Sequence, residues 1–318
     1  MANDTWSSVL HEGIATFMKR PIVKPQRDAI KNNNVKAALL GIPFDGTTIT
    51  RTGSTMGPRK FRDVSSSTIP YHFDYDTDIV ETYNVHDCGD VQVKIGSPFE
   101  TVERGKKDVL ELLHGGAMPM VVGGDHLVTV SATRAFEEFN PKGNYGFIIF
   151  DSHLDTATDI DGDKWNHCCP VPRTMELSCF NPNNAVIIGP HGAMNPRAEY
   201  EYVKENNISL YTMRDIYSKG IQQVMEEAIK IASDGTDGVY VSIDMDSLDA
   251  SETPGTCAPT PGGITSREMI LAIDQLGELD IIGFDVVEIA PPYDHADTTA
   301  ITASRFAVDM LGSRARYL

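Results

Sequence analysis

The sequence has little of several features that mark particular classes of protein. It contains five cysteines, an odd number, and no Cys-x-x-Cys pair, so we expect a reduced, cytoplasmic protein without a disulfide framework. Positive charge is scarce, because 27 Lys and Arg stand against 45 Asp and Glu, which gives a net charge of -18. So few cations argue against binding to a phosphate backbone, and we expect no nucleic-acid partner.

The chain also lacks a long apolar run and a leader-like beginning. No stretch reaches the roughly 18 consecutive apolar residues of a membrane span. The first residues have no basic head followed by an apolar stretch, so we expect neither a membrane partner nor secretion. The composition is ordinary for a globular protein, with 41% hydrophobic and 23% charged residues, and 318 residues can bury a large core.

Short apolar runs bounded by turn residues predict buried strands. These runs are nearly continuous rather than alternating, as expected for a sheet covered on both faces. They span 36–44, 145–151, 184–189, 238–244 and 280–288. Helical spacing between them predicts helices over 98–116, 125–139, 195–206, 221–233, 266–277 and 298–311. Strand and helix in alternation predict βαβ units and a largely parallel sheet.

No linker, repeat or composition shift divides the chain, so we expect a single domain over 1–318. Residues 1–35 are expected to form an N-terminal extension that packs on this domain or on a neighbouring subunit. Ser266 is the expected capped start of its helix. The stretch 156–183 is polar and rich in Gly and Pro, and it is expected to be a loop with a functional role.

Three segments carry candidate chemistry. They read VVGGDH (121–126), FIIFDSHLD (147–155) and VYVSIDMDSLD (239–249); the first two run from an apolar strand into Asp and His, and the third runs into Asp alone. Residues two apart in extended chain point to one face, and open α/β sheets bind ligands at the carboxyl ends of their strands. We therefore expect six side chains to converge: His126, Asp151, His153, Asp155, Asp244 and Asp246.

Six ligands are too many for one tetrahedral zinc ion, and their oxygen-rich character favours manganese. Two metals that share carboxylates would use all six and could activate a bridging water. Each segment has a simpler alternative. Asp125 could cap a helix, a single histidine could be structural, and the Asp-x-Asp-x-x-Asp pattern resembles a calcium loop, although it lacks the EF-hand glycine and closing glutamate.

Taken together, the three segments resemble the metal-binding signatures of the ureohydrolase superfamily, which contains arginase and agmatinase. Three further segments are similar to its agmatinase-like branch, and the likeness runs in order over nearly the whole chain. These segments are GIATFMKRP (13–21), GIPFDGTTITRTGSTMGPRKFRD (41–63) and VVEIAPPYDHADTTAITASR (286–305). The resemblance implies a three-layer α/β/α domain that assembles as a homo-trimer or homo-hexamer.

The resemblance also implies roles for individual residues. His126, Asp151, Asp155 and Asp244 would hold one Mn2+, and His153, Asp151, Asp244 and Asp246 would hold the other, with Ni2+ as the less expected metal. Asp155 would accept a hydrogen bond from the metal-bridging hydroxide that attacks the guanidinium carbon. Glu288 would bind the guanidinium, and His167, titrating near neutrality, would shuttle a proton to the departing nitrogen. The products would be an amine and urea.

The sequence departs from the family pattern at positions that are not expected metal ligands, and several of them fall on loops that we expect to border the substrate. These are Leu127, Ser152, the pair Cys168 and Cys169, Ala250, and the loop 255–260 with Cys257. Agmatine is the first expected substrate, and guanidinobutyrate, guanidinopropionate and guanidine stay open. Two other functions also stay open: a non-catalytic subunit of a mixed oligomer, and a protein that only senses a guanidino ligand.

Overall fold

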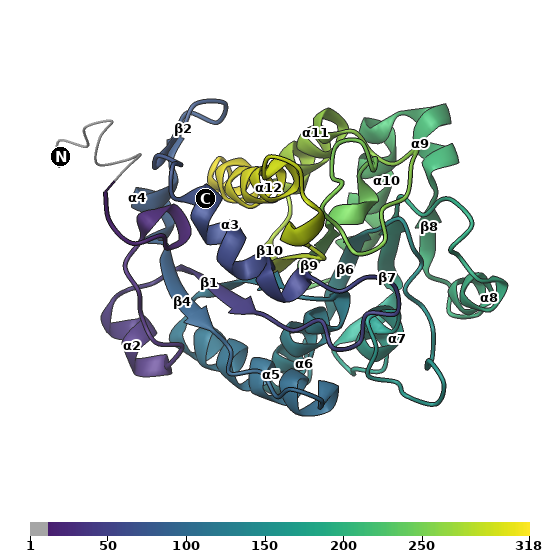
Figure 1. Cartoon of the computed structure of the whole chain (residues 1–318), viewed down its shortest axis with the longest axis horizontal. Coiled ribbons are helices and arrows are strands. Elements are labelled where there is room, and N and C mark those ends of the chain that lie inside the picture. Colours follow the sequence, from purple (N-terminus) through teal and green to yellow (C-terminus); the bar gives the residue numbers. More distant parts are fainter. Residues whose placement is uncertain (1–11) are drawn as a thin grey trace.

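The computed structural model describes residues 12–318 and has one central sheet between two layers of helices (Figure 1). The strands of this sheet are β1 (Ala37–Ile42), β4 (His86–Asp90), β5 (Met118–Gly123), β6 (Tyr145–Phe150), β7 (Phe180–Ile188), β8 (Ser209–Tyr211), β9 (Gly238–Asp244) and β10 (Ile281–Val287). Their order is β4-β1-β5-β10-β9-β6-β7-β8, and every pair is parallel. A separate antiparallel hairpin consists of β2 (Tyr71–His72) and β3 (Thr77–Asp78).

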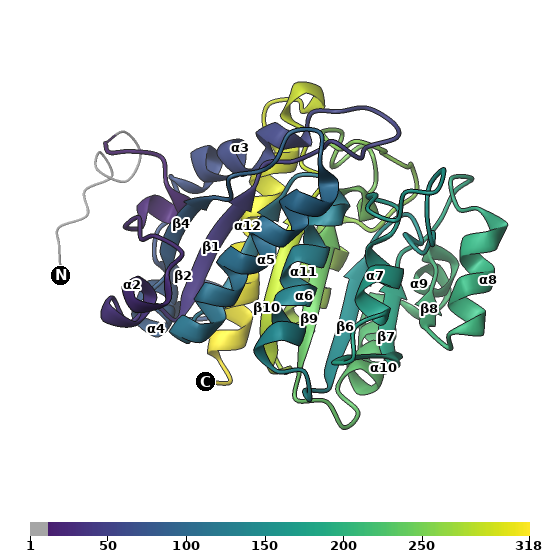
Figure 2. The same cartoon turned by 90° about the horizontal axis from the view of Figure 1, so that it is seen from below.

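Helices cover both faces of the sheet (Figures 1 and 2). One face carries α3 (Gly57–Ser65), α4 (Ile79–Tyr83), α9 (Met213–Lys219), α10 (Ile221–Ala232), α11 (Ser266–Leu276) and α12 (Thr298–Ala315). The other carries α2 (Arg27–Asn32), α5 (Pro98–Gly115), α6 (Thr129–Phe139) and α7 (Pro170–Met175), while α8 (Arg197–Glu205) lies beyond the β8 edge. The expected single-domain, three-layer α/β/α fold with a parallel sheet is confirmed. No helix in residues 12–318 is both long and apolar enough to span a bilayer.

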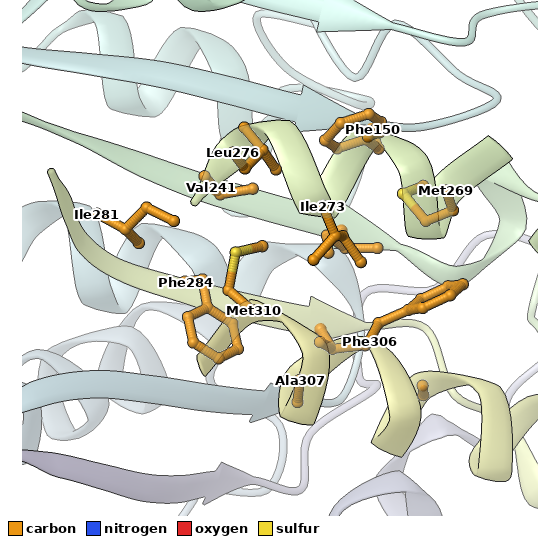
Figure 3. Close-up of a cluster of buried hydrophobic side chains, with 14 of the residues drawn as sticks. Phe150, Val241, Met269, Ile273, Leu276, Ile281, Phe284, Phe306, Ala307 and Met310 are labelled. Atoms are coloured by element: carbon orange, nitrogen blue, oxygen red, sulfur yellow. The ribbon is translucent and has the colours of Figure 1, made fainter. Parts of the chain in front are cut away.

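The sheet buries a hydrophobic layer on each face because nearly every residue of its central strands is apolar. On the α11 and α12 side, Phe150, Val241 and Phe284 project from three strands onto Ile273 and Phe306 (Figure 3). All five side chains are at most 1% exposed. This packing fixes the positions of the strands, and therefore of the residues at their carboxyl ends.

The chain order of the strands differs from their order in space at one point that matters for function. The last two strands, β9 and β10, fill the space between β5 and β6. As a result, the four adjacent central strands, β5, β10, β9 and β6, all end at the same edge of the sheet. This is the point at which open α/β sheets place their ligands.

Several details differ from expectation. The polar stretch 156–183 contains α7, which begins at Pro170, a residue whose fixed φ suits the first turn of a helix. Helix α11 is capped by Thr265 rather than Ser266, because Thr265 and Glu268 form a reciprocal capping box. Strand β4 was not expected at all, since its sequence HDCGD is largely polar.

Part of the N-terminal extension is described. Phe17 and Met18 are buried, and their N–H groups donate to Asp87 Oδ2 at 2.8 Å and to Ser65 Oγ at 3.2 Å. Arg62 also pairs with Asp87, with Nε and Oδ2 2.8 Å apart. The remaining part of the expected extension, residues 1–11, lies outside the described residues.

Candidate metal centre and active site

Polar residues occupy the carboxyl ends of the four central strands. His126 follows β5, Asp151 follows β6, Asp244 ends β9 and Glu288 follows β10, and each is at most 2% exposed. Gly124 permits the turn after β5, since a Cβ at this position would overlap the carbonyl oxygen of Phe44. The sheet therefore gathers residues that are far apart in the sequence.

The first group of ligand atoms surrounds Nδ1 of His126. This nitrogen lies 3.0 Å from Asp151 Oδ2, 3.1 Å from Asp155 Oδ2 and 3.1 Å from Asp244 Oδ2. Adjacent ligands of one small divalent ion, each roughly 2.1 Å from it, have about this spacing.

A buried hydrogen-bond chain orients the imidazole of His126. Ser242 Oγ donates to Asp285 Oδ1 at 2.6 Å, so its single hydrogen is committed. The contact of 2.9 Å between His126 Nε2 and Ser242 Oγ therefore has Nε2 as the donor. Tyr240 holds the other oxygen of Asp285 at 2.8 Å. With its proton on Nε2, His126 turns the lone pair of Nδ1 toward the three carboxylates.

The second group lies beside the first. His153 Nδ1 is 3.3 Å from Asp151 Oδ1 and 3.3 Å from Asp246 Oδ2. Ser152 fixes Asp246 by donating from Oγ to Oδ1 at 2.8 Å. Asp151 thus presents one oxygen to each histidine. Asp244 presents Oδ2 to the first group, and its Oδ1 accepts the backbone N–H of Asp246 at 2.8 Å, just as Asp151 Oδ1 accepts the backbone N–H of His153 at 2.6 Å.

This arrangement fits bound cations. A lone pair and three buried carboxylate oxygens repel one another unless positive charge lies between them. Burial and the neighbouring carboxylates Asp246 and Asp151 raise the pKa of Asp244 well above its ordinary value. Burial and Asp151 likewise raise the pKa of Asp155, to about 6. Nδ1 of His126 and Oδ2 of Asp151 are buried without a hydrogen-bond partner, as expected of metal ligands.

Glu288 and His167 lie together at the side of this cluster. Glu288 Oε1 accepts from the backbone N–H of His126 at 3.0 Å and lies 3.2 Å from His167 Nδ1. Glu288 Oε2 is buried without a hydrogen-bond partner. Glu288 has a φ of +61°, and Asp155 has a φ of +49°. Such left-handed backbone is costly for side-chain-bearing residues and collects at functional sites.

The environment of His167 differs from the expected titration near neutrality. Burial lowers its pKa, but the neighbouring Cys168 thiol and Glu288 carboxylate outweigh this effect and raise it. The N–H of Ile49 donates to Nε2 at 3.1 Å, so this nitrogen presents a lone pair. In this neutral form the single ring proton is on Nδ1, which faces Glu288, and the second proton that the raised pKa favours has to displace the Ile49 contact at Nε2.

Sequence reasoning missed the residues that hold these loops in place. Asp125 does not cap its helix. Its Oδ2 instead accepts from the Thr47 N–H at 3.0 Å and the Thr47 hydroxyl at 2.7 Å. Thr47 Oγ1 in turn accepts the N–H of His167 at 3.0 Å. The only signal for this role in the sequence was a carboxylate directly before a candidate ligand.

The unusual cysteines occupy different environments. Cys168 and Cys257 line the pocket above the carboxylates, and Cys169 is fully buried outside it. The loop that carries Cys257 is tied to the loop after β1. Thr50 Oγ1 donates to the Cys257 carbonyl at 2.9 Å, and Arg51 Nε donates to the Thr256 carbonyl at 3.0 Å.

The sequence profile of the arginase family matches residues 35–312. The chain belongs to the arginase family. It is 33% identical over 277 residues to an agmatinase of Bacillus subtilis (strain 168), which covers 86% of this chain and 90% of that relative. It is 31% identical over 300 residues to a guanidinopropionase of Pseudomonas aeruginosa, which covers 94% of this chain and 91% of that relative.

Solved structures agree with this assignment. The proclavaminate amidino hydrolase of Streptomyces clavuligerus matches with a TM-score of 0.89 at 27% identity, covering 97% of this chain and 99% of that one. The expected ureohydrolase resemblance, its agmatinase-like branch and the class of enzyme, a hydrolase, are confirmed. The arginase-family fold implies a binuclear metal centre, and the two ligand groups around His126 and His153 are the candidates for it.

Proposed function

We propose that this arginase-family protein is a binuclear metal hydrolase that converts a guanidino compound into an amine and urea. Agmatine is the first candidate substrate. The observation that carries the proposal is the convergence of two imidazole nitrogens and several carboxylate oxygens beside a glutamate with one unpaired oxygen. The similarity to an agmatinase and a guanidinopropionase supports the same class of reaction.

We assign the ligands as the family resemblance implies. His126, Asp151, Asp155 and Asp244 would hold one ion, and His153, Asp151, Asp244 and Asp246 would hold the other. Asp151 is the better supported bridge, since each of its oxygens faces a different histidine. The absence of sulfur among these ligands favours Mn2+ over Ni2+. Two such ions, when bound, supply the Lewis acidity that makes water a nucleophile at neutral pH.

Glu288 binds and orients the substrate in this proposal. Because His126 and His167 occupy Oε1, the unpaired Oε2 accepts an N–H of the guanidinium. The charge-assisted bond holds the planar cation beside the carboxylate cluster. Asp155 lines the same pocket and accepts the hydrogen bond of the attacking water.

His167 supplies the proton that the departing nitrogen needs. The donor is the imidazolium, the form that Cys168 and Glu288 favour by raising the pKa of His167. On giving up one proton it returns to the neutral imidazole, in which Nε2 accepts from the Ile49 N–H and Nδ1 faces Glu288. General acid catalysis of this kind requires the donor to lie within hydrogen-bond reach of the leaving group. Both groups line the pocket that would hold the substrate.

The assembly and location are also proposals. We infer a homo-trimer or homo-hexamer in the cytoplasm, with residues 1–35 packing on the domain or a neighbouring subunit. The low cysteine content supports a reducing compartment. The burial of Phe17 and Met18 supports packing of the extension on its own domain.

Urea release tests the proposed activity. The purified chain is loaded with Mn2+ and offered agmatine, guanidinobutyrate, guanidinopropionate and guanidine, and bound metal is counted in parallel. We expect urea from at least one compound. We also expect His126→Ala to lose both metal and activity, whereas His114→Ala, at an exposed histidine of α5, retains both. Two bound ions without urea from any compound would favour a non-catalytic subunit or a sensor.

A further inference from the structure

The pocket above the carboxylate cluster is small, with a volume of about 130 Å³, and two glutamates line it. Glu199 Oε2 accepts from the Thr156 N–H at 3.3 Å, whereas Glu288 Oε2 has no nitrogen or oxygen partner among residues 12–318. His126 and His167 hold Glu288 only at Oε1, and contacts to one oxygen leave the carboxylate free to turn about it. A further contact is needed to keep Oε2 turned toward the pocket.

The thiol of Cys257 supplies this contact. Cys257 lines the same pocket, is 2% exposed, and its thiol interacts with the Glu288 carboxylate. Burial, and then the charge of Glu288, raise the pKa of the thiol far above its ordinary value, so the sulfur keeps its proton. A thiol is a single, weak donor. It therefore restrains the carboxylate without satisfying it as an N–H group would.

A second buried group directs the thiol hydrogen. The hydroxyl of Ser54 interacts with the sulfur of Cys257. Ser54 is fully buried, and within the described part of the chain its hydroxyl has no nitrogen or oxygen partner. Because the hydroxyl donates to the sulfur, the hydrogen of the thiol is left for Glu288.

The loop that carries Cys257 is bonded to the segment that carries Glu288. Ala290, two residues after Glu288, donates its N–H to the Gly255 carbonyl at 2.7 Å. The Thr50 hydroxyl also holds this loop, through the Cys257 carbonyl at 2.9 Å. The thiol and the carboxylate therefore belong to backbone segments whose relative position is fixed.

We propose that Cys257 is a positioning residue for Glu288. Its S–H keeps Oε2 turned toward the pocket, and it gives way to the stronger, charged N–H donors of the guanidinium when the substrate enters. This inference rests on the proposed hydrolase activity, in which Glu288 binds the guanidinium, and adds the residue that prepares Glu288 for it. The chain departs from the family pattern in the loop of Cys257, so the role does not follow from family membership.

Two substitutions separate the hydrogen-bond donor from the volume of the side chain. Cys257→Ala removes the donor, and Cys257→Ser keeps a donor on a side chain that is also smaller than cysteine. Cys179→Ala is the matched control, since Cys179 is 1% exposed but does not line the pocket. Steady-state kinetics is measured on the Mn2+-loaded full chain with the compound that the wild type hydrolyses best. Circular dichroism and metal content establish that each variant is folded and loaded.

We expect Cys257→Ala to raise KM roughly two- to tenfold, the range that corresponds to one weak hydrogen bond. Its kcat should change little, because Glu288 binds the guanidinium in the ground state and the transition state alike. Cys257→Ser should bring KM back close to the wild-type value. Cys179→Ala should match the wild type in both constants.

A side chain that only fills space predicts a different result, since Ala and Ser are both smaller than Cys. Equal KM values for Cys257→Ala and Cys257→Ser, whether raised or not, would therefore overturn the role of Cys257. A fall in kcat or in bound metal at constant KM would overturn it as well, because neither is expected from a weaker hold on Glu288.

Failure of the proposed function itself has a separate signature, which is the absence of urea from every compound with the wild-type chain. The same Mn2+-loaded proteins are then compared by the Kd for agmatine, measured by calorimetry. Tighter binding by the wild type and Cys257→Ser than by Cys257→Ala would support the role of Cys257 in a protein that only binds the guanidinium. Equal affinities, or no binding by the wild type, would overturn that role too.

Discussion

The hydrogen-bond chain behind His126 leads to a quantitative prediction. In Ser242→Ala, the hydroxyl that accepts from His126 Nε2 and donates to Asp285 Oδ1 is lost. The other hydroxyl nearby belongs to Thr129, which lies 3.4 Å from Ser242 Oγ and also interacts with Asp285. We expect the imidazole to lose its fixed orientation and part of its basicity.

Two contributions determine the size of the effect. A buried polar group that loses its partner costs about 1–3 kcal/mol. For Asp285 the cost is moderated because burial raises its pKa, which makes protonation easier. This cost lowers the stability of the metal-free and metal-loaded protein alike. The loss of an outer partner of a histidine ligand lowers metal affinity by about 10–100-fold. We therefore expect that loss at the His126 site and a smaller effect at the His153 site, which shares Asp151 but does not contact Ser242.

A two-site metal titration by calorimetry measures this difference directly. The matched control is Ser313→Ala, since Ser313 is equally buried but only donates to Met310 within α12, at 3.2 Å. Its two metal affinities should equal those of the wild type. Equal weakening of both sites in Ser242→Ala, or no weakening of either in a folded variant, would refute the assignment of His126 as a ligand oriented by Ser242.

Three further predictions concern the core, the pocket and the metals. Gly146→Ala should destabilise the protein by several kcal/mol in denaturant unfolding, because a Cβ at this position would overlap the Ala232 carbonyl oxygen. Stability close to that of the wild type would contradict the close packing of β6 on α10. Cys168→Gly should change the relative rates across the substrate panel, whereas Cys169→Thr should not, because Cys168 lines the pocket and Cys169 does not. Unchanged relative rates in both variants would leave this pair of cysteines without a role in specificity. Removal of bound metal with a chelator should lower Tm, because metal at 100 times its Kd contributes about 2.7 kcal/mol per site to the free energy of unfolding. Identical thermal unfolding curves of the metal-loaded and metal-free protein would argue against metal bound at the buried carboxylates.

Much of the fold could be predicted because the central strands are apolar throughout. The runs 145–151 and 238–244 differ from β6 and β9 by at most one residue. Strand β4 could not be predicted in this way, because it lies at the edge of the sheet and pairs only with β1. The six residues of α7 include two prolines, and their helical conformation depends on Pro170 lying in the first turn.

The candidate ligands could be predicted because they follow strands directly, so that sequence distance and sheet geometry together bring them to one edge. The residues that support these ligands could not be predicted, because each forms hydrogen bonds between two segments that are far apart in the sequence. Asp285 lies within the apolar run of β10, where a carboxylate is itself a signal that a buried partner exists. Glu199 gave no such signal. On a helix with alternating charges it resembles an ordinary solvent-facing residue, and only the tertiary structure brings it to the pocket.

The fold separates the residues for the reaction from those for the choice of substrate. The ligand groups project from the ends of rigid central strands, and none of the positions that depart from the family pattern is a candidate ligand. The two cysteines of the pocket wall lie on loops instead: Cys257 is on a segment held by the hydrogen bond from Thr50, and Cys168 follows the loop histidine. Substitutions on these segments can therefore alter the tail that is accepted without disturbing the metal centre. For this reason a change in KM for one tail, at constant metal content, is the expected signature of the pocket wall, whereas joint loss of metal and turnover is the signature of the strand ends.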